Sequence, residues 1–508
     1  MSVHPGPGRD GVRSSAIRLA AVVVLGAVVR LVAARASAAH PCFATPDPAF
    51  DEALYRTLGA AVARGELPLV AHGQSSTAYP LWLGLLYTAF GDGPAVAVLG
   101  NVALGCATIA LVFVATRDLL RSRTAGLLAA AGVALYGPLV AFDASALKVS
   151  LGMFFAALSL VLYARESAAR GPGRAFALGV AAALAADVNR LVLAPFGLLL
   201  AGRMVAVVAP CRTCGGTAHA ARWRLVVRGA AIGAGFSLAA TVLALAGGQR
   251  PGDLAAHAAV HLHVGNHRGA SGGYDAIDGV LPSAAGHLRD ARRIAERDAG
   301  RPLDALSSAR FWLERSVAFA IDRPGEWLGL LRAKLAHLVA AAEIPSGESL
   351  LWPDGPPQVV AVLPGFTTAM VLAVAGALAL GRGAVPLGAA AIAYASGMLL
   401  FFVTARYRVT LALVLWPLAA GGFVAALRAA RAGSWRRPAT WLVVVGSLAA
   451  IATASAVDES RAVGEYRRLA EERVARCELR RRRLETAARI APGVSARDAR
   501  TEGAEASN

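Results

Sequence analysis

The feature that most constrains this chain is its series of long apolar runs, each of about 18 to 24 residues with few charges. A run of this length matches the hydrocarbon thickness that one α-helix crosses. Charged residues make up 17% of the chain, whereas soluble proteins carry about 25%, and the mean hydropathy is +0.53. We therefore expect an all-α, polytopic integral membrane protein, and exclude a soluble enzyme, a secreted disulfide scaffold and a disordered protein.

About eleven transmembrane helices are expected, two of them in the longest run. The first run is long for the apolar part of a signal peptide, and no small-residue cleavage site ends it, so we interpret it as a helix. A semi-apolar stretch at 79–90 is typical of a re-entrant or interfacial helix. The apolar runs cover residues 17–34, 93–116, 124–141, 145–164, 175–208, 227–246, 358–380, 384–403, 409–427 and 439–456.

Arginines in the short loops predict the orientation, because cytoplasmic loops are enriched in basic residues. The net charge of +18 is then explained by topology, without nucleic acid as a partner. Eleven spans leave the tail outside, where the run Arg480–Arg483 fits poorly, so ten spans with a cytoplasmic tail remain the alternative. The predicted parts are 1–34, N-terminus and first helix; 35–92, first extracytoplasmic loop with interfacial helices; 93–246, transmembrane helices; 247–357, second extracytoplasmic loop; 358–456, C-terminal transmembrane helices; 457–508, charged helical tail, partly disordered.

Polar chemistry is concentrated in the two outer loops, which hold much of the acid and most of the histidine. A channel or carrier would place ionisable groups at mid-membrane between broken helices. The pattern thus favours an outer-face enzyme over a lipid-linked glycan flippase or carrier. A non-catalytic protein of envelope assembly is a further alternative. The loop histidines are His40, His72, His257, His261, His263, His267, His287 and His337.

The first outer loop contains the most informative motif. Asp47 followed by Pro48 predicts a helix N-cap with proline at the first helical position. Asp51 and Tyr55 then share one helical face, which becomes apolar further on, as in a helix lying on the bilayer. An acid beside lipid can serve as a general base. The structural alternative is that Asp47 only caps the helix and that Asp51 and Glu52 complement its dipole.

These residues resemble a known family. Asp51-Glu52-Ala53-x-Tyr55, with Gly65 ending the helix, is similar to the first-loop motif of the GT-C superfamily of membrane glycosyltransferases. Its bacterial branch includes lipid A aminoarabinose transferases and protein O-mannosyltransferase-like enzymes. The resemblance covers about residues 15–430 through short, degenerate motifs. The other stretches that resemble family motifs are Ser76–Trp82, Tyr136-Gly137-Pro138 to Lys148, Asp187–Arg190, Val264–His267 and Arg406-Tyr407-Arg408.

The resemblance implies an inverting transfer of a sugar from a polyprenyl-phosphate donor to a lipid, glycan or protein acceptor. The reaction would occur on the periplasmic face of a bacterial inner membrane. The first-loop aspartate is the base in this family, so that role is carried over to Asp51, with Glu52 and Asp47 as less certain helpers. Some relatives use a divalent metal, so Mg or Mn is a possible cofactor and no other is expected.

A leaving phosphate also needs cations. The predicted phosphate-binding residues near outer helix ends are Lys148, Arg190, Arg406 and Arg408, and Tyr55, Asn189 and Asn266 complete the predicted substrate-binding set. Each cation has a structural alternative: Arg190 pairing with Asp187, Arg406 and Arg408 anchoring to headgroups, and Lys148 pairing with Asp143. Lys334 is interpreted as structural.

Other sites have little support in the sequence. His257 and His261 are spaced i, i+4 and could share a metal, but no HExxH motif is present. Cys211 and Cys214 form a CxxC without a second pair. The five cysteines are too scattered to predict a disulfide framework. There is no Walker A, no GxGxxG after a strand and no GxSxG, so nucleotide binding and serine hydrolysis are not predicted.

Overall fold

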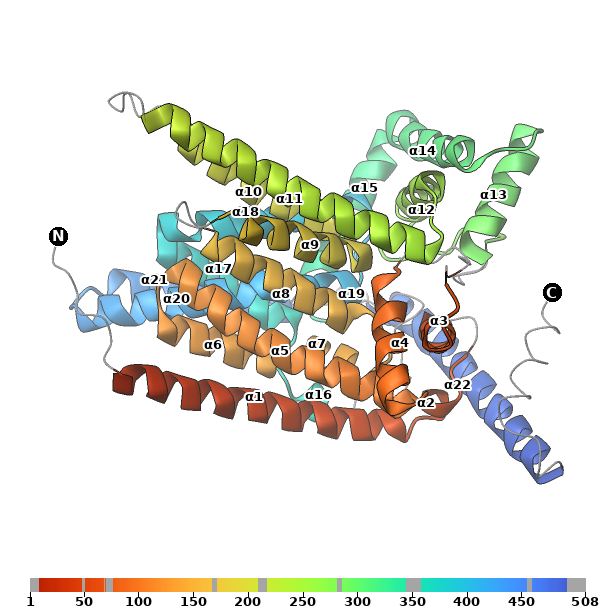
Figure 1. The fold of residues 1–508 in the computed structure, drawn as a ribbon, viewed down its shortest axis with the longest axis horizontal. Helices are drawn as coiled ribbons and strands as arrows, with labels where there is room; N and C mark the ends of the chain where they lie inside the picture. Colours follow the sequence, from red (N-terminus) through yellow and green to blue (C-terminus); the bar gives the residue numbers. More distant parts are fainter. Residues whose placement is uncertain are drawn as a thin grey trace.

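The structure is a computed structural model, and Figure 1 shows its helices running side by side in one bundle, with further helices gathered at one end. Every regular element in the described residues is a helix, as the apolar runs predict. The CxxC at Cys211 and Cys214 lies outside the described residues. The structure describes residues 9–47, 51–67, 69, 76–166, 171–208, 217–280, 286–343, 358–454 and 459–490.

The predicted apolar runs all form helices, with breaks where the sequence changes the local backbone. Asn189 interrupts the run 175–208, because its extended backbone ends α9 and its side chain accepts a hydrogen bond from Leu191 N. The run 124–141 bends by 58° between α6 and α7, where Pro138 occupies the first turn of α7.

The helices of the bundle are α1 (Arg9–Ala38), α5 (Pro94–Leu120), α6 (Arg123–Ala134), α7 (Gly137–Asp143), α8 (Val149–Arg165), α9 (Gly173–Val188), η1 (Arg190–Val192), α10 (Leu193–Val208), α11 (Thr217–Gly247), α16 (Gln358–Ala361), α17 (Phe366–Leu380), η2 (Gly381–Ala384), α18 (Val385–Leu400), α19 (Ala405–Arg408), η3 (Val409–Leu411), α20 (Ala412–Arg431) and α21 (Arg436–Ala454). They form a multi-pass helical membrane protein. By length and composition, five described helical segments suffice to cross a membrane, or six if the bent pair α6–α7 is one span. The finer count of eleven stays a prediction.

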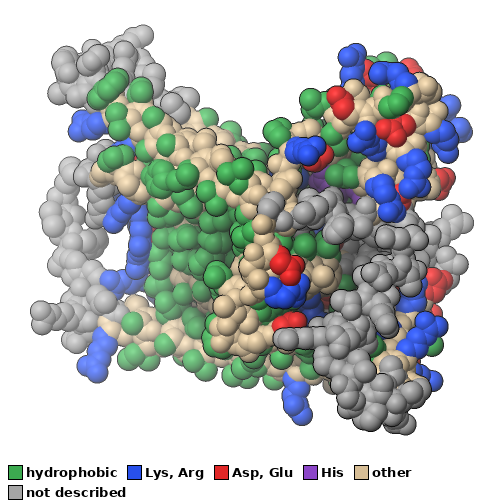
Figure 2. All heavy atoms as spheres, turned by 45° about the vertical axis from the view of Figure 1, so that its right-hand side comes forward, with side chains coloured by type: hydrophobic (Ala, Val, Ile, Leu, Met, Phe, Trp, Pro, Cys, Tyr) green, Lys and Arg blue, Asp and Glu red, His purple; other side chains and the backbone are tan. Residues whose placement is uncertain are grey.

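The two predicted outer loops lie at the same end of the bundle, on the right of Figure 1. The stretch predicted at 79–90 forms α4. Figure 2 shows a wide apolar surface on the bundle and charged side chains gathered on the lobe formed by the second loop. The helices at this end are α2 (Pro41–Ala44), α3 (Asp51–Ala63), α4 (Ala78–Phe90), α12 (Pro251–Val264), α13 (Gly286–Ala299), α14 (Ala305–Asp322), α15 (Pro324–Val339) and α22 (Glu459–Ile490).

A buried ion pair inside the bundle was not predicted. Arg30 Nε donates to Asp143 Oδ2 at 2.7 Å, and both side chains are fully buried. Asp143 also accepts a hydrogen bond from Ser150. The alternative in which Lys148 pairs with Asp143 is therefore wrong: arginine from α1 and serine from α8 satisfy this carboxylate.

Candidate active site

The first-loop acids are placed by the short helix α3. Asp51, Tyr55 and Leu58 all lie on its buried face, with 7%, 1% and 8% of their surfaces exposed. The face predicted from their spacing is therefore the packed face. Tyr55 Oη lies 3.5 Å from Asp51 Oδ2. The predicted N-cap of Asp47 with Pro48 involves residues 48–50, which lie outside the described residues.

Asp51 is joined to the end of the bundle by Arg406. The Nη1 of Arg406 donates to Asp51 Oδ2 at 3.1 Å, and the two side chains are 12% and 9% exposed. Arg406 lies on α19, the single turn that follows α18. The structure thus brings together two predicted site residues that are 355 positions apart.

Glu52 and Asp47 have different partners, both from the C-terminal helix α22. Arg473 Nη2 binds Glu52 Oε2 at 2.7 Å, and Arg476 Nε binds Asp47 Oδ2 at 2.7 Å. Burial raises the pKa of Glu52, with the charge of Arg473 opposing the rise. Cys477 on the same helix forms a disulfide with Cys42. The scattered cysteines did not predict this bond, because the two residues are 435 positions apart.

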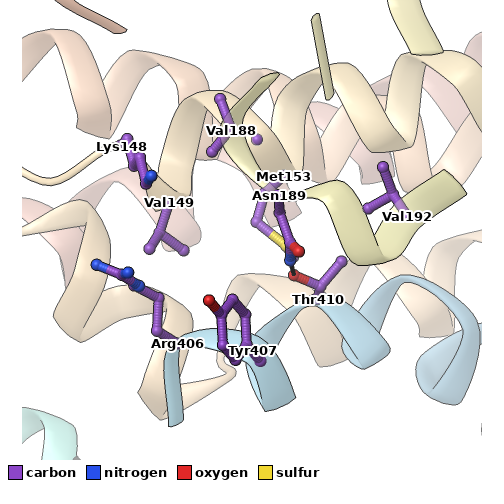
Figure 3. Close-up of a pocket in the computed structure, with 10 residues that line it drawn as sticks. Lys148, Val149, Met153, Val188, Asn189, Val192, Arg406, Tyr407 and Thr410 are labelled. Carbon is purple, nitrogen blue, oxygen red and sulfur yellow. Dashed lines mark hydrogen bonds between the residues drawn. The ribbon is translucent and has the colours of Figure 1, made fainter. Parts of the chain in front are cut away.

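A small cavity lies beside the Asp51–Arg406 pair. Lys148, at the start of α8, and Arg406 line one side of it, and Asn189 and Thr410 line the other, with the Tyr407 ring between them (Figure 3). Lys148 is 4% exposed, and its Nζ lies 5.9 Å from the centroid of the Tyr55 ring. Two predicted cations and the predicted Asn189 therefore share one cavity.

The cavity adjoins a second one, and both are lined by Val192 and Thr410. The second cavity is walled almost entirely by apolar side chains of α8, α10, α18 and α20, among them Leu160, Phe196 and Leu413. Two cations at one end and an apolar continuation at the other suit a ligand with an anionic head and a hydrocarbon chain.

Other predicted residues lie away from this cavity. Arg408 is fully buried, donates to the carbonyl oxygens of His337, Ala340 and Ala342 and forms an ion pair with Glu343 at 2.8 Å. It therefore secures the second loop and does not line the cavity with Arg406. Asn266 accepts from Lys334 Nζ at 3.0 Å and donates to Leu400 O.

Lys334 also binds Leu399 O, and it is fully buried. Burial lowers its pKa to about 8. Its predicted structural role fits these contacts, and Asn266 shares that role.

Asp187 and Arg190 do not act simply as partners of each other. Asp187 Oδ2 accepts hydrogen bonds from Ser76 Oγ, Thr77 N and Ala78 N at 2.8 to 3.0 Å. This carboxylate therefore holds the N-terminus of α4. A negative charge is favourable there, because the free backbone amides of the first turn point toward it. Arg190 follows Asn189 in η1 and is not among the residues that line the cavity.

Three histidines of the second loop cluster together. The ring centroids of His257 and His261 are 4.0 Å apart, and that of His287 is 4.9 Å from His261. Burial lowers the pKa of all three, so they are neutral near pH 7. Even so, no three His, Cys, Asp or Glu side chains converge as metal ligands within the described ranges. The first-loop acids are each bound to a different arginine, and a divalent metal, Mg or Mn, stays a prediction.

The sequence missed several residues near the acids and the cavity. Tyr407 lies within the quoted Arg406-Tyr407-Arg408 motif and could have been chosen with its neighbours. Thr410 and Met153 carry no signal that separates them from other residues of apolar helices. Arg473 lies in a charged tail, where its role depends on a contact 421 positions away.

Comparisons with known proteins add a structural similarity only. No family model matches the chain, and no curated protein matches it. Over 91% of its length, the chain is similar to a solved structure of the oligosaccharyltransferase AglB from Archaeoglobus fulgidus, in complex with an inhibitory peptide and a dolichol-phosphate, with 13% identity and a TM-score of 0.42. The match covers 56% of that chain, so the present chain spans just over half its length.

A second similar structure is ArnT from Cupriavidus metallidurans bound to undecaprenyl phosphate, with 17% identity and a TM-score of 0.31. This match covers 80% of the present chain and 79% of ArnT. Similarity of this extent leaves the function to be argued from the residues around the cavity.

Proposed function

We propose that the protein is a glycosyltransferase that moves a sugar from a polyprenyl-phosphate donor to an acceptor hydroxyl. The observation that carries the proposal is the arrangement of one acid, two cations and an apolar cavity. Lys148 and Arg406 line the first cavity, Asp51 binds Arg406, and the first cavity adjoins the second, apolar one. A lipid-linked phosphate matches this arrangement, because it has an anionic head for the cations and a hydrocarbon chain for the apolar cavity.

Each group then has a step in an inverting displacement. The acceptor oxygen attacks the anomeric carbon of the sugar and forms the new glycosidic bond. The bond from that carbon to the phosphate oxygen breaks, and its electron pair leaves on the phosphate. Asp51 takes the acceptor proton, while Lys148 and Arg406 stabilise the charge on the departing phosphate.

The side of the membrane is part of the proposal. Disulfides persist in oxidising compartments, and the Cys42–Cys477 bond joins the first loop to the tail. This supports a site on the outer face of a bacterial inner membrane, with the tail on that same side. It favours the odd number of spans over ten spans with a cytoplasmic tail.

The test is an Asp51→Asn variant in cells that lack the native gene. We expect the glycan product to fall about 10²- to 10⁴-fold, the range for loss of a general base, at an unchanged protein level. The matched control is Asp118→Asn, which removes a carboxylate from the ion pairs with Arg117 and Arg165. Mass spectrometry of envelope glycans and lipids gives the readout. An unchanged profile with Asp51→Asn would contradict the catalytic role and favour a carrier or an assembly protein.

A binding measurement tests the cations separately. Purified protein in detergent is titrated with undecaprenyl phosphate as the probe. We expect Lys148→Met to weaken binding about 10-fold or more, because it removes a charge that faces the phosphate. Equal affinity in the wild type and Lys148→Met would contradict the placement of the phosphate.

A further inference from the structure

The C-terminal helix α22 contacts the first loop through three residues that lie within little more than one helical turn. Arg473, Arg476 and Cys477 bind Glu52, Asp47 and Cys42 respectively. Arg473, Cys42 and Cys477 are each at most 2% exposed. A solvated charged tail would not bury an arginine and a disulfide in this way, so α22 is an integrated part of the outer end.

The contact falls on the residue next to the proposed base. Successive residues of an α-helix point about 100° apart around its axis. Asp51 therefore points toward Arg406 of the bundle while Glu52 points toward Arg473 of the tail. Both acids are buried, with 7% and 5% of their surfaces exposed. The first turn of α3 is held between two arginines that come from different parts of the chain.

Further along α3, the helix is held by other means. The side chain of Leu83 packs closely against Gly59, and that of Val62 against Gly84, so each glycine lets a side chain of the other helix approach its backbone. Tyr55 meets Tyr79 edge to face at 5.2 Å. These contacts fix the middle and the end of α3. In the described residues, the ion pairs of its first turn are those with Arg406 and with Arg473 of α22.

We propose that α22 is a positioning element of the candidate active site, in which Arg473 holds Glu52 and thereby orients the first turn of α3 so that Asp51 faces Arg406 and the cavity. The disulfide Cys42–Cys477 keeps Arg473 in place. This inference rests on the proposed function, because it assigns a role relative to Asp51. It assigns a positioning role to Arg473, which lies outside the sequence motifs and is not proposed to contact the substrate.

The test separates positioning from binding. For Arg473→Met, we expect transfer, measured as Asp51-dependent glycan product per amount of protein, to fall about 10- to 100-fold, since small misplacements of reacting groups have effects of this size. Binding of undecaprenyl phosphate, which uses Lys148 and Arg406, should stay unchanged. The exchange Glu52→Arg with Arg473→Glu should recover most of the lost transfer, because it restores the pair with reversed charges.

The matched control is Arg481→Met on the same helix. Arg481 binds Glu485 within α22 and is 46% exposed, so the substitution removes the same charge without touching the first loop. We expect no change in transfer or in binding. The variant Cys42→Ser with Cys477→Ser should lower transfer less than Arg473→Met, because the ion pairs remain.

Two results would overturn the positioning role. One is wild-type transfer in Arg473→Met. The other is a joint loss of transfer, lipid binding and thermal stability that the charge exchange does not recover, since that would show a contribution to folding alone. Failure of the proposed function has a different signature: the wild type itself would yield no Asp51-dependent product.

Discussion

Two arginine–aspartate pairs of similar length occupy different regions of this protein. In the bundle, Arg30 binds Asp143 at 2.7 Å, and both side chains are fully buried. At the outer end, Arg406 binds Asp51 at 3.1 Å, and both side chains retain about a tenth of their exposure. The two pairs consist of the same groups but differ in what surrounds them.

The surroundings decide what each pair can do. Arg30 also donates to Gly26 O and Ala134 O at 3.1 and 2.9 Å, and the hydroxyl of Ser150 donates to the other carboxylate oxygen of Asp143. This pair is closed off and connects α1, α6, α7 and α8. Arg406, by contrast, lines a cavity beside Lys148. A charge is available for chemistry when it faces space that a ligand can enter.

The largest expected effect is on the closed pair. Asp143→Asn or Arg30→Met alone leaves one buried group without its partner, so we expect a loss of about 3 to 5 kcal/mol in the free energy of unfolding. The double variant Arg30→Met with Asp143→Leu should recover much of that loss. Thermal unfolding of the purified protein in detergent measures both. If either single variant is as stable as the wild type, the Arg30–Asp143 pair does not stabilise the fold as proposed.

The open pair should behave in the opposite way. Arg406→Met is expected to lower transfer about 10²- to 10³-fold, the effect of losing one donor that stabilises a developing anion, with a smaller change in unfolding temperature than the Arg30 variant shows. Product formation and thermal unfolding are measured on the same preparations. If Arg406→Met reduces stability as much as Arg30→Met does, the comparison fails.

Acid should affect the outer end through the histidine cluster. Burial lowers the pKa of His287 from 6.5 to about 4, with the charge of Asp51 opposing the shift. The unfolded chain therefore binds the proton first as the pH falls, and stability declines between about pH 6.5 and pH 4. At about pH 5 the loss is about 2 kcal/mol for this residue. The difference between the unfolding temperatures at neutral and acidic pH should become smaller in His287→Gln, where His257 and His261 still contribute to it, and should stay unchanged in Arg30→Met.

The smallest effect is expected for an exposed pair at the opposite end of the bundle. Arg165 binds Asp118 at 2.7 Å, but its side chain is 42% exposed. Arg165→Met should change the free energy of unfolding by less than about 1 kcal/mol, because water screens such pairs and side-chain entropy opposes them. A loss as large as that of the Arg30 variant would mean that exposure does not separate these pairs.

Much of the fold could be predicted because bilayer thickness imposes a length on each helix. The predicted run 227–246 lies within α11, and the run 93–116 lies within α5 except for its first residue, Gly93. The semi-apolar stretch 79–90 coincides with α4 except for one residue. Hydropathy does not predict Arg30, which sits in the first apolar run and whose partner lies 113 positions away.

The candidate site could be predicted in part. Motifs and helix ends indicated Asp51, Lys148, Asn189 and Arg406, which the structure places around one cavity or in contact with it. Their catalytic and binding roles remain proposals. Contacts between distant segments were beyond a single sequence, as Arg473 shows most clearly. Residues of one motif can also diverge: Arg406 faces the cavity, whereas its neighbour two positions on, Arg408, is bound to backbone carbonyls.

The bond between Cys42 and Cys477 also has a consequence for the integrity of the chain. It closes a ring that contains all residues between these two positions. A protease that cuts any one loop within this ring leaves a single covalent molecule, which separates into two pieces only after reduction. The ring can close only after residue 477 has been synthesised and has reached the first loop. Oxidation therefore follows synthesis of the segment that contains Cys477, and it marks chains in which α22 has reached the first loop.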